Sequence, residues 1–372
     1  TWKKDGTILY GDFGTDPSTK IAGFDMDSTL IETKSGKTFA QNANDWKWWD
    51  SSVPEKLKEA HDDGFKIVIF SNQAGVSTGM TTVDNLKSKF CQIHKALGFP
   101  IQTLCATESD QNRKAATGMW KYFAKECNGD SVPDLKESFY CGDAAGRPKL
   151  KKRKKDFSDT DRKFAINIGI TFYTPEMYFH GLKEKLPPLK FDIRKFKDLE
   201  GEIPFNTKED ISSDKQEMVI FVGSPGSGKS TLWSNHFKDY VRVNNDTLKT
   251  KEKCMKVARQ ALKDGKSCVI DNTNPEKDTR ARYIPIAEEF KVPCRAFFFD
   301  IDKTICMHNN EQRKKNPHRD HFSKKVGNVI IHTFFKRVQK PTTAEGFTEV
   351  RTVKFVPGPF ENEDDKESYY NG

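Results

Sequence analysis

The sequence predicts an α/β protein of two tandem domains, each a mostly parallel sheet flanked by helices. Short apolar runs typical of buried strands recur along both halves of the chain, and most gaps between them are long enough for a helix. This alternation is typical of parallel sheets. A Lys-, Glu- and Pro-rich stretch with little periodicity, residues 181–216, separates the halves and is the expected junction. We therefore expect one domain over residues 1–188 and another over 189–372.

The first half contains a helix-length gap between Val83 and Leu97 and five expected strands. In chain order these strands are Ile21–Phe24, Phe65–Phe70, Ile101–Cys105, Phe139–Cys141 and Ala165–Ile168. The expected strands of the second half are Val219–Val222, Tyr240–Val243, Cys268–Ile270 and Arg295–Phe299. The tail from Glu361 is acidic and polar, so we expect it to be loosely ordered.

The composition disfavours several classes of protein. The eight cysteines form no CxxC pair, which argues against a disulfide framework and a zinc site and fits a reducing compartment. No apolar run approaches the length that spans a membrane, and the start Thr1–Asp5 does not resemble a signal peptide. The first residue is not Met, which is consistent with a fragment of a longer protein.

The formal net charge of +9 favours polyanionic partners. The densest basic segment is Lys149–Lys155. Three interpretations of this segment stay open: a solvated loop, a nucleic-acid contact, or a nuclear-import signal.

A glycine-rich loop in the second half predicts a nucleotide site. The segment Gly223–Ser230 reads Gly-Ser-Pro-Gly-Ser-Gly-Lys-Ser, follows the apolar run 218–222 and precedes an expected helix over 231–237. Such loops aim backbone N–H groups at phosphate oxygens, while the lysine reaches the β- and γ-phosphates and the last hydroxyl ligates Mg²⁺. The expected ATP-binding residues are Gly223, Ser224, Pro225, Gly226, Ser227, Gly228, Lys229, Ser230 and Thr231.

Two carboxylates, Asp25 and Asp27, follow the first expected strand in a DxDxT pattern. One can attack phosphorus and become an acyl-phosphate, while the other protonates the leaving oxygen and later deprotonates water. Two carboxylates facing a phosphate dianion require a metal, and hard oxygen ligands specify Mg²⁺.

The same DxDxT pattern recurs at Asp300–Thr304, so the pattern by itself is weak. Only the first copy is followed by further site residues, which are Ser71, Lys114 and Asp143. They would supply a phosphate-binding hydroxyl, a cation and another metal carboxylate. We interpret the second copy as a strand-to-helix turn.

This ordered set resembles the haloacid dehalogenase phosphatase superfamily and, within it, the metazoan polynucleotide kinase 3′-phosphatase family. The resemblance covers essentially the whole chain in the same domain order. The segments that carry it are Phe24–Ile31, Phe70–Gln73, Arg113–Lys114, Thr117–Trp120, Gly142–Arg147, Asn244–Leu248, Asp271–Pro275, Thr279–Tyr283 and His308–Asn310.

In the first domain the resemblance implies a haloacid dehalogenase-like, Rossmannoid phosphatase. Asp25 would be the nucleophile and Asp27 the general acid/base, and Ser71 and Lys114 would bind the phosphate. Asp25, the Asp27 backbone carbonyl and Asp143 would hold Mg²⁺. Departures are small: Ser28 stands where Gly is usual, and Ala115 replaces Pro.

A second acidic ligand near Asp143 is not obvious in the sequence. Asp161 is either an outer-shell candidate for the metal or an ordinary aspartate on the surface of a helix.

In the second domain the resemblance implies a P-loop kinase that uses Mg²⁺ and ATP. Asp246 closes the second expected strand, where it is either the base for an incoming 5′-hydroxyl or the N-cap of the next helix. Asp271 either orients Mg²⁺ through water or caps a turn. Arg313 is the expected lid arginine.

Asn245 and Glu311 stand where relatives carry Arg, so strand binding would depend on other basic residues. The candidates near in sequence are Lys249, Arg259, Arg280 and Arg282.

The expected function is the healing of broken DNA ends: hydrolysis of a 3′-phosphate and transfer of the ATP γ-phosphate to a 5′-hydroxyl. The expected partners are DNA ends, ATP and repair scaffold proteins recruited through a region before Thr1, with no membrane. We expect a nuclear monomer with a mitochondrial pool. Alternatives are the same chemistries on RNA ends, a small-molecule phosphatase fused to a P-loop module, and a DNA-end scaffold with decayed sites. The last is disfavoured because the site residues are all present.

Overall fold

The computed structural model describes residues 1–150, 153–205, 211–315 and 325–372, and the chain divides into two compact units. Unit 1 comprises Thr1–Lys190 together with Glu367–Gly372, and unit 2 comprises Phe191–Lys366. The expected boundary lay between residues 188 and 189, and residues 367–372 were expected in the second domain. The structure places that last segment in unit 1 instead, because the Asn167 side chain donates to the Asn371 carbonyl at 2.9 Å and Lys121 pairs with Glu367 at 2.6 Å.

Unit 1 is built on a seven-stranded sheet with the order β1-β2-β7-β6-β3-β8-β9. The strands from β7 to β9 in this order are parallel, and β1 and β2 join antiparallel at one edge. A short antiparallel pair, β4 and β5, follows β3. The bounds are β1 Trp2–Asp5, β2 Ile8–Asp12, β3 Ile21–Phe24, β4 Ile31–Glu32, β5 Lys47–Trp48, β6 Lys66–Asn72, β7 Gln102–Ala106, β8 Phe139–Cys141 and β9 Thr171–Tyr173.

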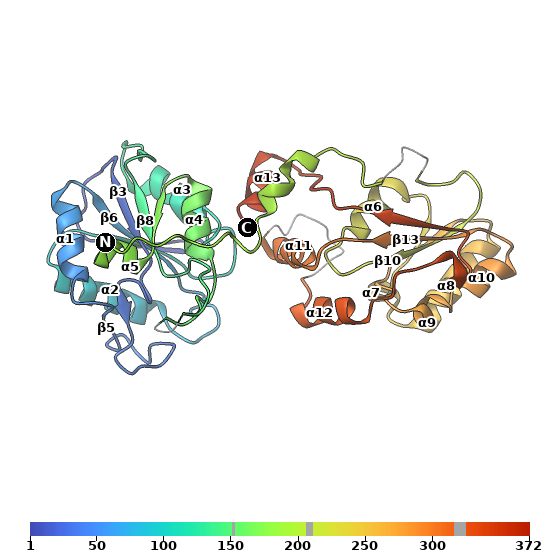
Figure 1. Cartoon of the computed structure of the whole chain (residues 1–372), viewed down its shortest axis with the longest axis horizontal. Coiled ribbons are helices and arrows are strands. Elements are labelled where there is room, and N and C mark those ends of the chain that lie inside the picture. The colour runs from blue at the N-terminus through green and yellow to red at the C-terminus, as the bar shows by residue number, and fades with distance from the viewer. Residues whose placement is uncertain (151–152, 206–210, 316–324) are drawn as a thin grey trace. The chain divides into compact units, whose positions relative to one another are not determined.

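Helices cover both faces of this sheet (Figure 1). In β6, Ile67 and Ile69 pack into the core on one face, while Val68 and Phe70 pack into the core on the other. Burial on both faces explains why the strand is continuously apolar. The first face is covered by α1 Val53–Asp62, α2 Val83–Leu97 and α5 Pro175–His180, and the second by α3 Gly118–Tyr122, η1 Phe123–Cys127 and α4 Thr160–Ile168.

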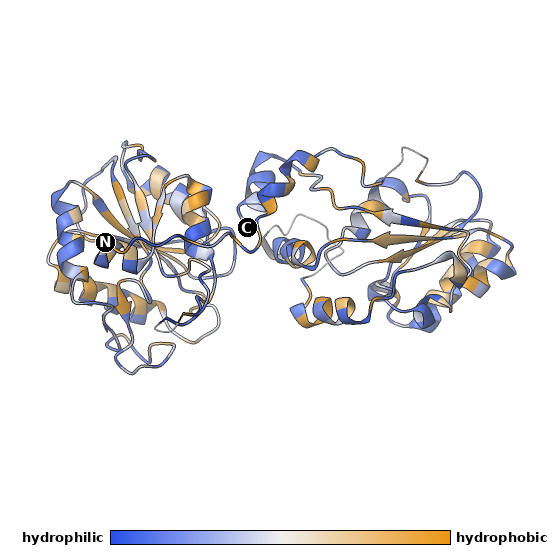
Figure 2. Ribbon diagram, viewed as in Figure 1, coloured by the Kyte–Doolittle hydropathy of each residue, from blue (hydrophilic) through white to orange (hydrophobic). Residues whose placement is uncertain are grey.

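Unit 2 has a five-stranded, fully parallel sheet with the order β11-β12-β10-β13-β14. Figure 2 shows hydrophobic residues along β10 and β13, and helices with both polar and hydrophobic residues beside them. The strands are β10 Met218–Val222, β11 Val241–Val243, β12 Cys268–Ile270, β13 Cys294–Phe299 and β14 Glu349–Val353.

The helices of unit 2 also pack on both faces of its sheet. One face is covered by α6 Lys229–His236, α11 Lys303–Lys315 and α12 Asn328–Arg337, and the other by α8 Lys251–Lys263 and α10 Ile284–Glu289. The remaining helical segments of unit 2 are η2 Ile193–Leu199, α7 Asn245–Leu248, α9 Lys277–Arg280 and η3 Thr343–Glu345. Helix α13 Glu363–Tyr370 begins in unit 2 and ends in unit 1. In the parts of the chain that the structure describes, no helix combines the length and apolarity needed to cross a bilayer.

Two sequence expectations are wrong. Residues 165–168 are not a strand but the end of α4, because Phe164 and Ala165 form the buried face of a short helix that Gly169 ends at φ 90°. The tail from Glu361 is not loosely ordered but forms α13, in which Tyr369 and Tyr370 are buried. Strands β1, β2, β9 and β14 were not expected from the sequence. The edge strands β1, β9 and β14 are largely exposed or half-buried, so their apolar signal is weak, and β2 lies next to β1 at one edge of its sheet.

A buried ion pair joins α9 to η3, two segments of unit 2 that lie far apart in the sequence. The fully buried Arg280 donates to Glu345 from Nε at 2.8 Å and from NH2 at 2.7 Å. Its NH1 donates to the carbonyls of Asn274, Pro275 and Gln339. Arg280 is therefore a structural residue and not a contact for a nucleic-acid strand.

Replacing Arg280 with Met should destabilise unit 2 by about 3–5 kcal/mol, because the change leaves the Glu345 carboxylate buried without its partner. Hydrogen exchange of peptides from β10 and β12 reports on this unit alone. The matched control is Arg259→Met, which removes an exposed pair with Glu289 worth about 0–1 kcal/mol. Equal losses of protection in the two variants would contradict the assignment.

Candidate active sites

The first site lies at the carboxyl edge of the unit 1 sheet. Strand β3 stands between β6 and β8, so the residues that follow these three parallel strands meet at one edge. Asp25 follows β3, Ser71 lies near the end of β6, and Asp143 comes just after β8. The Asp25 N–H donates to the Cys141 carbonyl at 2.9 Å, which extends the strand pairing into the site.

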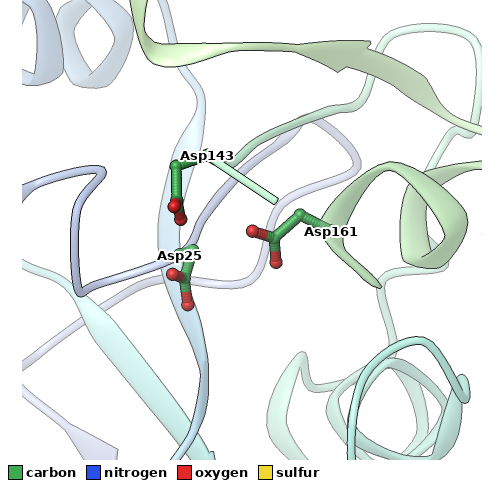
Figure 3. A group of neighbouring side chains, drawn as sticks. All are labelled: Asp25, Asp143 and Asp161. Carbon is green, nitrogen blue, oxygen red and sulfur yellow. The ribbon is translucent and has the colours of Figure 1, made fainter. Parts of the chain in front are cut away.

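Three carboxylates converge there. Asp25, Asp143 and Asp161 present oxygen atoms that all lie within 4.8 Å of one another (Figure 3). Asp161 projects from α4 toward the other two and is 2% exposed, so the interpretation of Asp161 as a helix-surface residue is wrong. Its Oδ2 accepts a hydrogen bond from the Ala144 N–H at 3.0 Å.

Lys114 supplies the cation of this cluster. Its Nζ lies 2.6 Å from Asp25 Oδ1 and 2.8 Å from Asp161 Oδ1. It also donates to the Phe70 carbonyl at 2.7 Å and lies 2.6 Å from the Tyr140 hydroxyl oxygen. Asn72 holds the lysine backbone from both sides, because it accepts from the Lys114 N–H at 2.9 Å and donates to its carbonyl at 3.0 Å. A loop residue is thereby fixed against the strand that carries Ser71.

The electrostatics of the cluster favour a bound cation. Burial, with the charge of Asp161 added to it, raises the pKa of Asp25 to about 7 even though Lys114 opposes the shift. Burial, Asp161 and Asp25 together raise the pKa of Asp143 to about 8. The carboxyl groups of Asp25, Asp143 and Asp161 lie together, partly or fully buried, near the single ammonium charge of Lys114. Clustered carboxylate oxygens are the ligands that Mg²⁺ binds. The residues present therefore fit the expected metal.

Gln73 hydrogen-bonds to the two remaining site residues, Asp27 and Ser71. No role for Gln73 was predicted from the sequence. Its Nε2 donates to Asp27 Oδ2 at 2.8 Å and to Ser71 Oγ at 2.8 Å. Asp27 is exposed, whereas Met26 beside it is fully buried, so Asp27 faces the solvent side of the site. Ser28 has φ 61°, a left-handed conformation that favours Gly.

The second site is the loop between β10 and α6. A Cβ at Gly226 would lie 2.3 Å from the Cys306 carbonyl oxygen, and Gly226 and Gly228 have φ of 80° and 93°, so both positions need glycine. Lys229 begins α6 and donates to the carbonyls of Gly223 at 3.0 Å and Ser224 at 2.8 Å. The loop and the start of α6 therefore have the arrangement expected of a phosphate-binding loop.

Arg313 lies close enough to the P-loop to act on Lys229. Burial, with the charge of Arg313 added to it, lowers the pKa of Lys229 to about 8, although Asp271 opposes the shift. The segment before Arg313 supports the loop, because Asn309 donates to the Gly226 carbonyl at 2.8 Å. Glu311 pairs with Lys325 at 2.7 Å.

Asp246 is not a helix cap. The N-cap of α7 is Asn244, whose side-chain oxygen accepts from the N–H groups of Asp246 at 2.9 Å and Thr247 at 3.3 Å. The capping interpretation of Asp246 is therefore wrong. Asp246 is exposed and comes shortly after β11, at the same edge of the parallel sheet as the P-loop that follows β10.

Asp271 follows β12 and its side chain is 1% exposed. Its Oδ2 accepts from Arg242 Nε at 2.9 Å and NH2 at 2.6 Å, an ion pair in place of the turn cap considered from the sequence. Arg242 NH2 also donates to Ser230 Oγ at 3.0 Å. Sequence reasoning missed Arg242, whose only signal was a charged residue inside an otherwise apolar strand.

The structure also shows the surroundings of the second DxDxT copy and of part of the basic segment. In the second DxDxT copy the Asp302 carboxylate accepts from the Thr304 N–H at 2.7 Å at the start of α11, as expected for a strand-to-helix turn. In the basic segment, Lys151 and Lys152 lie outside the described residues, while Arg153 pairs with Glu184 at 2.7 Å.

Comparisons with known proteins identify the family of the chain. A family model described as "Polynucleotide kinase 3 phosphatase" matches residues 20–179, and one described as "AAA domain" matches residues 218–335. The chain is 40% identical to the bifunctional polynucleotide phosphatase/kinase of Schizosaccharomyces pombe, over 95% of this chain and 84% of that protein. It is 33% identical to a putative bifunctional polynucleotide phosphatase/kinase of Acanthamoeba polyphaga mimivirus, over 95% and 90%. It is 36% identical to the polynucleotide 3′-phosphatase ZDP of Arabidopsis thaliana, over 48% and 27%.

Divalent-metal binding at the unit 1 cluster should weaken as the pH falls. The pKa of Asp25 is about 7 and that of Asp143 about 8, so the metal must displace protons from these carboxylates below pH 8. Each displaced proton lowers the apparent metal affinity by about tenfold per pH unit. Mn²⁺ affinity measured by electron paramagnetic resonance should therefore drop by at least about tenfold between pH 8 and pH 6. Asp143→Asn should lose this pH-dependent binding. Equal wild-type affinities at the two pH values would contradict the assignment.

Proposed function

Because the chain belongs to the family of bifunctional polynucleotide phosphatase/kinases, we propose that its substrates are the ends of broken DNA. Unit 1 hydrolyses 3′-phosphates, and unit 2 transfers the γ-phosphate of ATP to 5′-hydroxyls. The observation that carries this function is that one chain holds both the Lys114–carboxylate cluster and a P-loop with Asp246 at the same sheet edge. The net charge of +9 supports a polyanionic substrate.

In the phosphatase, the Asp25 carboxylate attacks phosphorus and the bond to the 3′ oxygen breaks, while Asp27 gives that oxygen a proton. Asp27 then takes a proton from water, which attacks the phospho-aspartate and releases inorganic phosphate. Lys114, 2.6 Å from Asp25, places its charge beside the transferred group. Asp25, the Asp27 carbonyl and Asp143 would hold Mg²⁺, which supplies charge neutralisation.

In the kinase, Asp246 accepts the proton of the incoming 5′-hydroxyl, whose oxygen attacks the γ-phosphorus as the bond to ADP breaks. Lys229 and Arg313 offset the charge on the phosphates, and Ser230 would hold Mg²⁺. Glu311, paired with Lys325, and Asn245 contribute no positive charge to strand binding. Other basic residues must hold the strand.

The same proposal includes a monomeric enzyme acting in the nucleus. The combination of both activities suits strand breaks, because one break can present a 3′-phosphate and a 5′-hydroxyl together. Phosphate hydrolysis and phosphorylation then produce the two ends that a ligase joins. RNA ends are the alternative substrate.

The two activities should be separable by mutation. Asp25→Ala removes the covalent acceptor, so 3′-phosphatase turnover should fall by about 10³ or more while kinase activity persists. Lys229→Ala should do the reverse. Matched DNA and RNA oligonucleotides with 3′-phosphate or 5′-hydroxyl ends, resolved on gels, measure both activities and the choice of nucleic acid. Loss of both activities from either folded variant, or a preference for RNA, would refute the corresponding part of the proposal.

Asp246→Asn should slow the chemical step of the kinase by about 10²–10⁴, because the amide keeps the shape and loses the basicity. ATP affinity and melting temperature should stay near those of the wild type. The control is Asn244→Ala, which removes the α7 cap at a cost of about 1 kcal/mol and should lower stability more than the rate. A near-normal kinase rate in Asp246→Asn would mean that another group activates the hydroxyl.

A further inference from the structure

Arg242 joins two residues of the kinase site that lie far apart in the sequence. Its NH2 donates to Ser230 Oγ at 3.0 Å and to Asp271 Oδ2 at 2.6 Å, and its Nε adds a bond to Asp271 at 2.9 Å. The guanidinium carbon lies 4.5 Å from the ring centroid of Trp233. The aromatic face and the carboxylate together fix the guanidinium next to the first turn of α6.

The ion pair between Arg242 and Asp271 changes the net charge of the nucleotide site. The Asp271 side chain is 1% exposed, and a buried carboxylate without a partner is costly. Asp271 accepts from the same Arg242 NH2 that donates to Ser230 Oγ, so it lies near the P-loop. Without Arg242, Asp271 would present an uncompensated negative charge to the incoming phosphates.

We propose that Arg242 is a positioning residue of the nucleotide site whose charge permits phosphates to bind in the absence of a metal. This inference rests on the proposed kinase function. Arg242 cancels the charge of Asp271 and occupies one lone pair of the Ser230 oxygen, which leaves the second lone pair for a cation. Nucleotide phosphates therefore meet the charge of Lys229 without opposition from Asp271, and Mg²⁺ can arrive with the nucleotide or after it.

The test is the affinity for ADP with excess Mg²⁺ and with EDTA, measured by titration calorimetry. In Arg242→Gln the metal-free Kd should rise by about tenfold or more, because Asp271 then repels the phosphates across a few ångströms. The Kd with Mg²⁺ should change much less, since the metal neutralises the freed carboxylate. The ratio of metal-free to Mg²⁺ Kd should therefore rise.

Two further variants separate charge from packing. Arg242→Lys keeps the charge and should keep most of the metal-free affinity. The double variant Arg242→Gln with Asp271→Asn removes both charges and should return the ratio toward the wild-type value. Arg259→Gln, which breaks the exposed pair with Glu289, is the matched control and should leave both Kd values unchanged.

Equal changes of both Kd values in Arg242→Gln would leave the ratio unchanged and overturn the inference, because a packing defect weakens both states alike. Failure of Asp271→Asn to restore the ratio would also overturn it. A folded wild-type protein that binds no ADP under either condition would instead remove the kinase assignment, and this inference with it. Phosphatase activity of each variant reports that unit 1 is intact.

Discussion

The buried ammonium of Lys114 is the interaction on which the phosphatase unit depends. Its side chain is 2% exposed and lies between the carboxylates of Asp25 and Asp161. Burial by itself lowers the pKa of Lys114, but Asp161 and Asp25 outweigh that effect and raise it overall, so the lysine stays charged. The carboxylates in turn lie within 4.8 Å of one another, where their repulsion would be severe without a cation. Each charge is therefore tolerated only because of the others.

Sheet order brings these groups together. The order β6-β3-β8 places Ser71, Asp25 and Asp143 at one edge although long segments separate them in the chain. Helix α4 contributes Asp161 to the cluster and also carries Asn167, whose Nδ2 donates to the carbonyls of Ala115 and Asn371, each at 2.9 Å. The loop that carries Lys114 is thus tied to a segment that follows the whole kinase sequence. This contact explains why residues 367–372 belong to unit 1.

The side chains around the two candidate phosphate sites carry opposite net charge. The phosphatase cluster is acidic, which suits a metal and a carboxylate nucleophile. Around the P-loop, Lys229, Arg313 and Arg242 outnumber the buried carboxylate of Asp271. That excess of positive charge suits a triphosphate, which brings several negative charges of its own.

The sequence by itself determined both architectures, because parallel strands buried on two faces are continuously apolar. It also predicted candidate site residues, because glycine-rich loops and paired aspartates stand at strand ends. Tertiary structure decided what depends on neighbours distant in the chain. Asp161 joined the cluster of carboxylates with Asp25 and Asp143, Asn244 replaced Asp246 as the cap, and Arg242 paired with Asp271. Residues 165–168 became helix because the packing of Phe164 and Ala165 outweighed local β-propensity. Side-chain partners come from the order of strands and the docking of helices, and local patterns do not encode either.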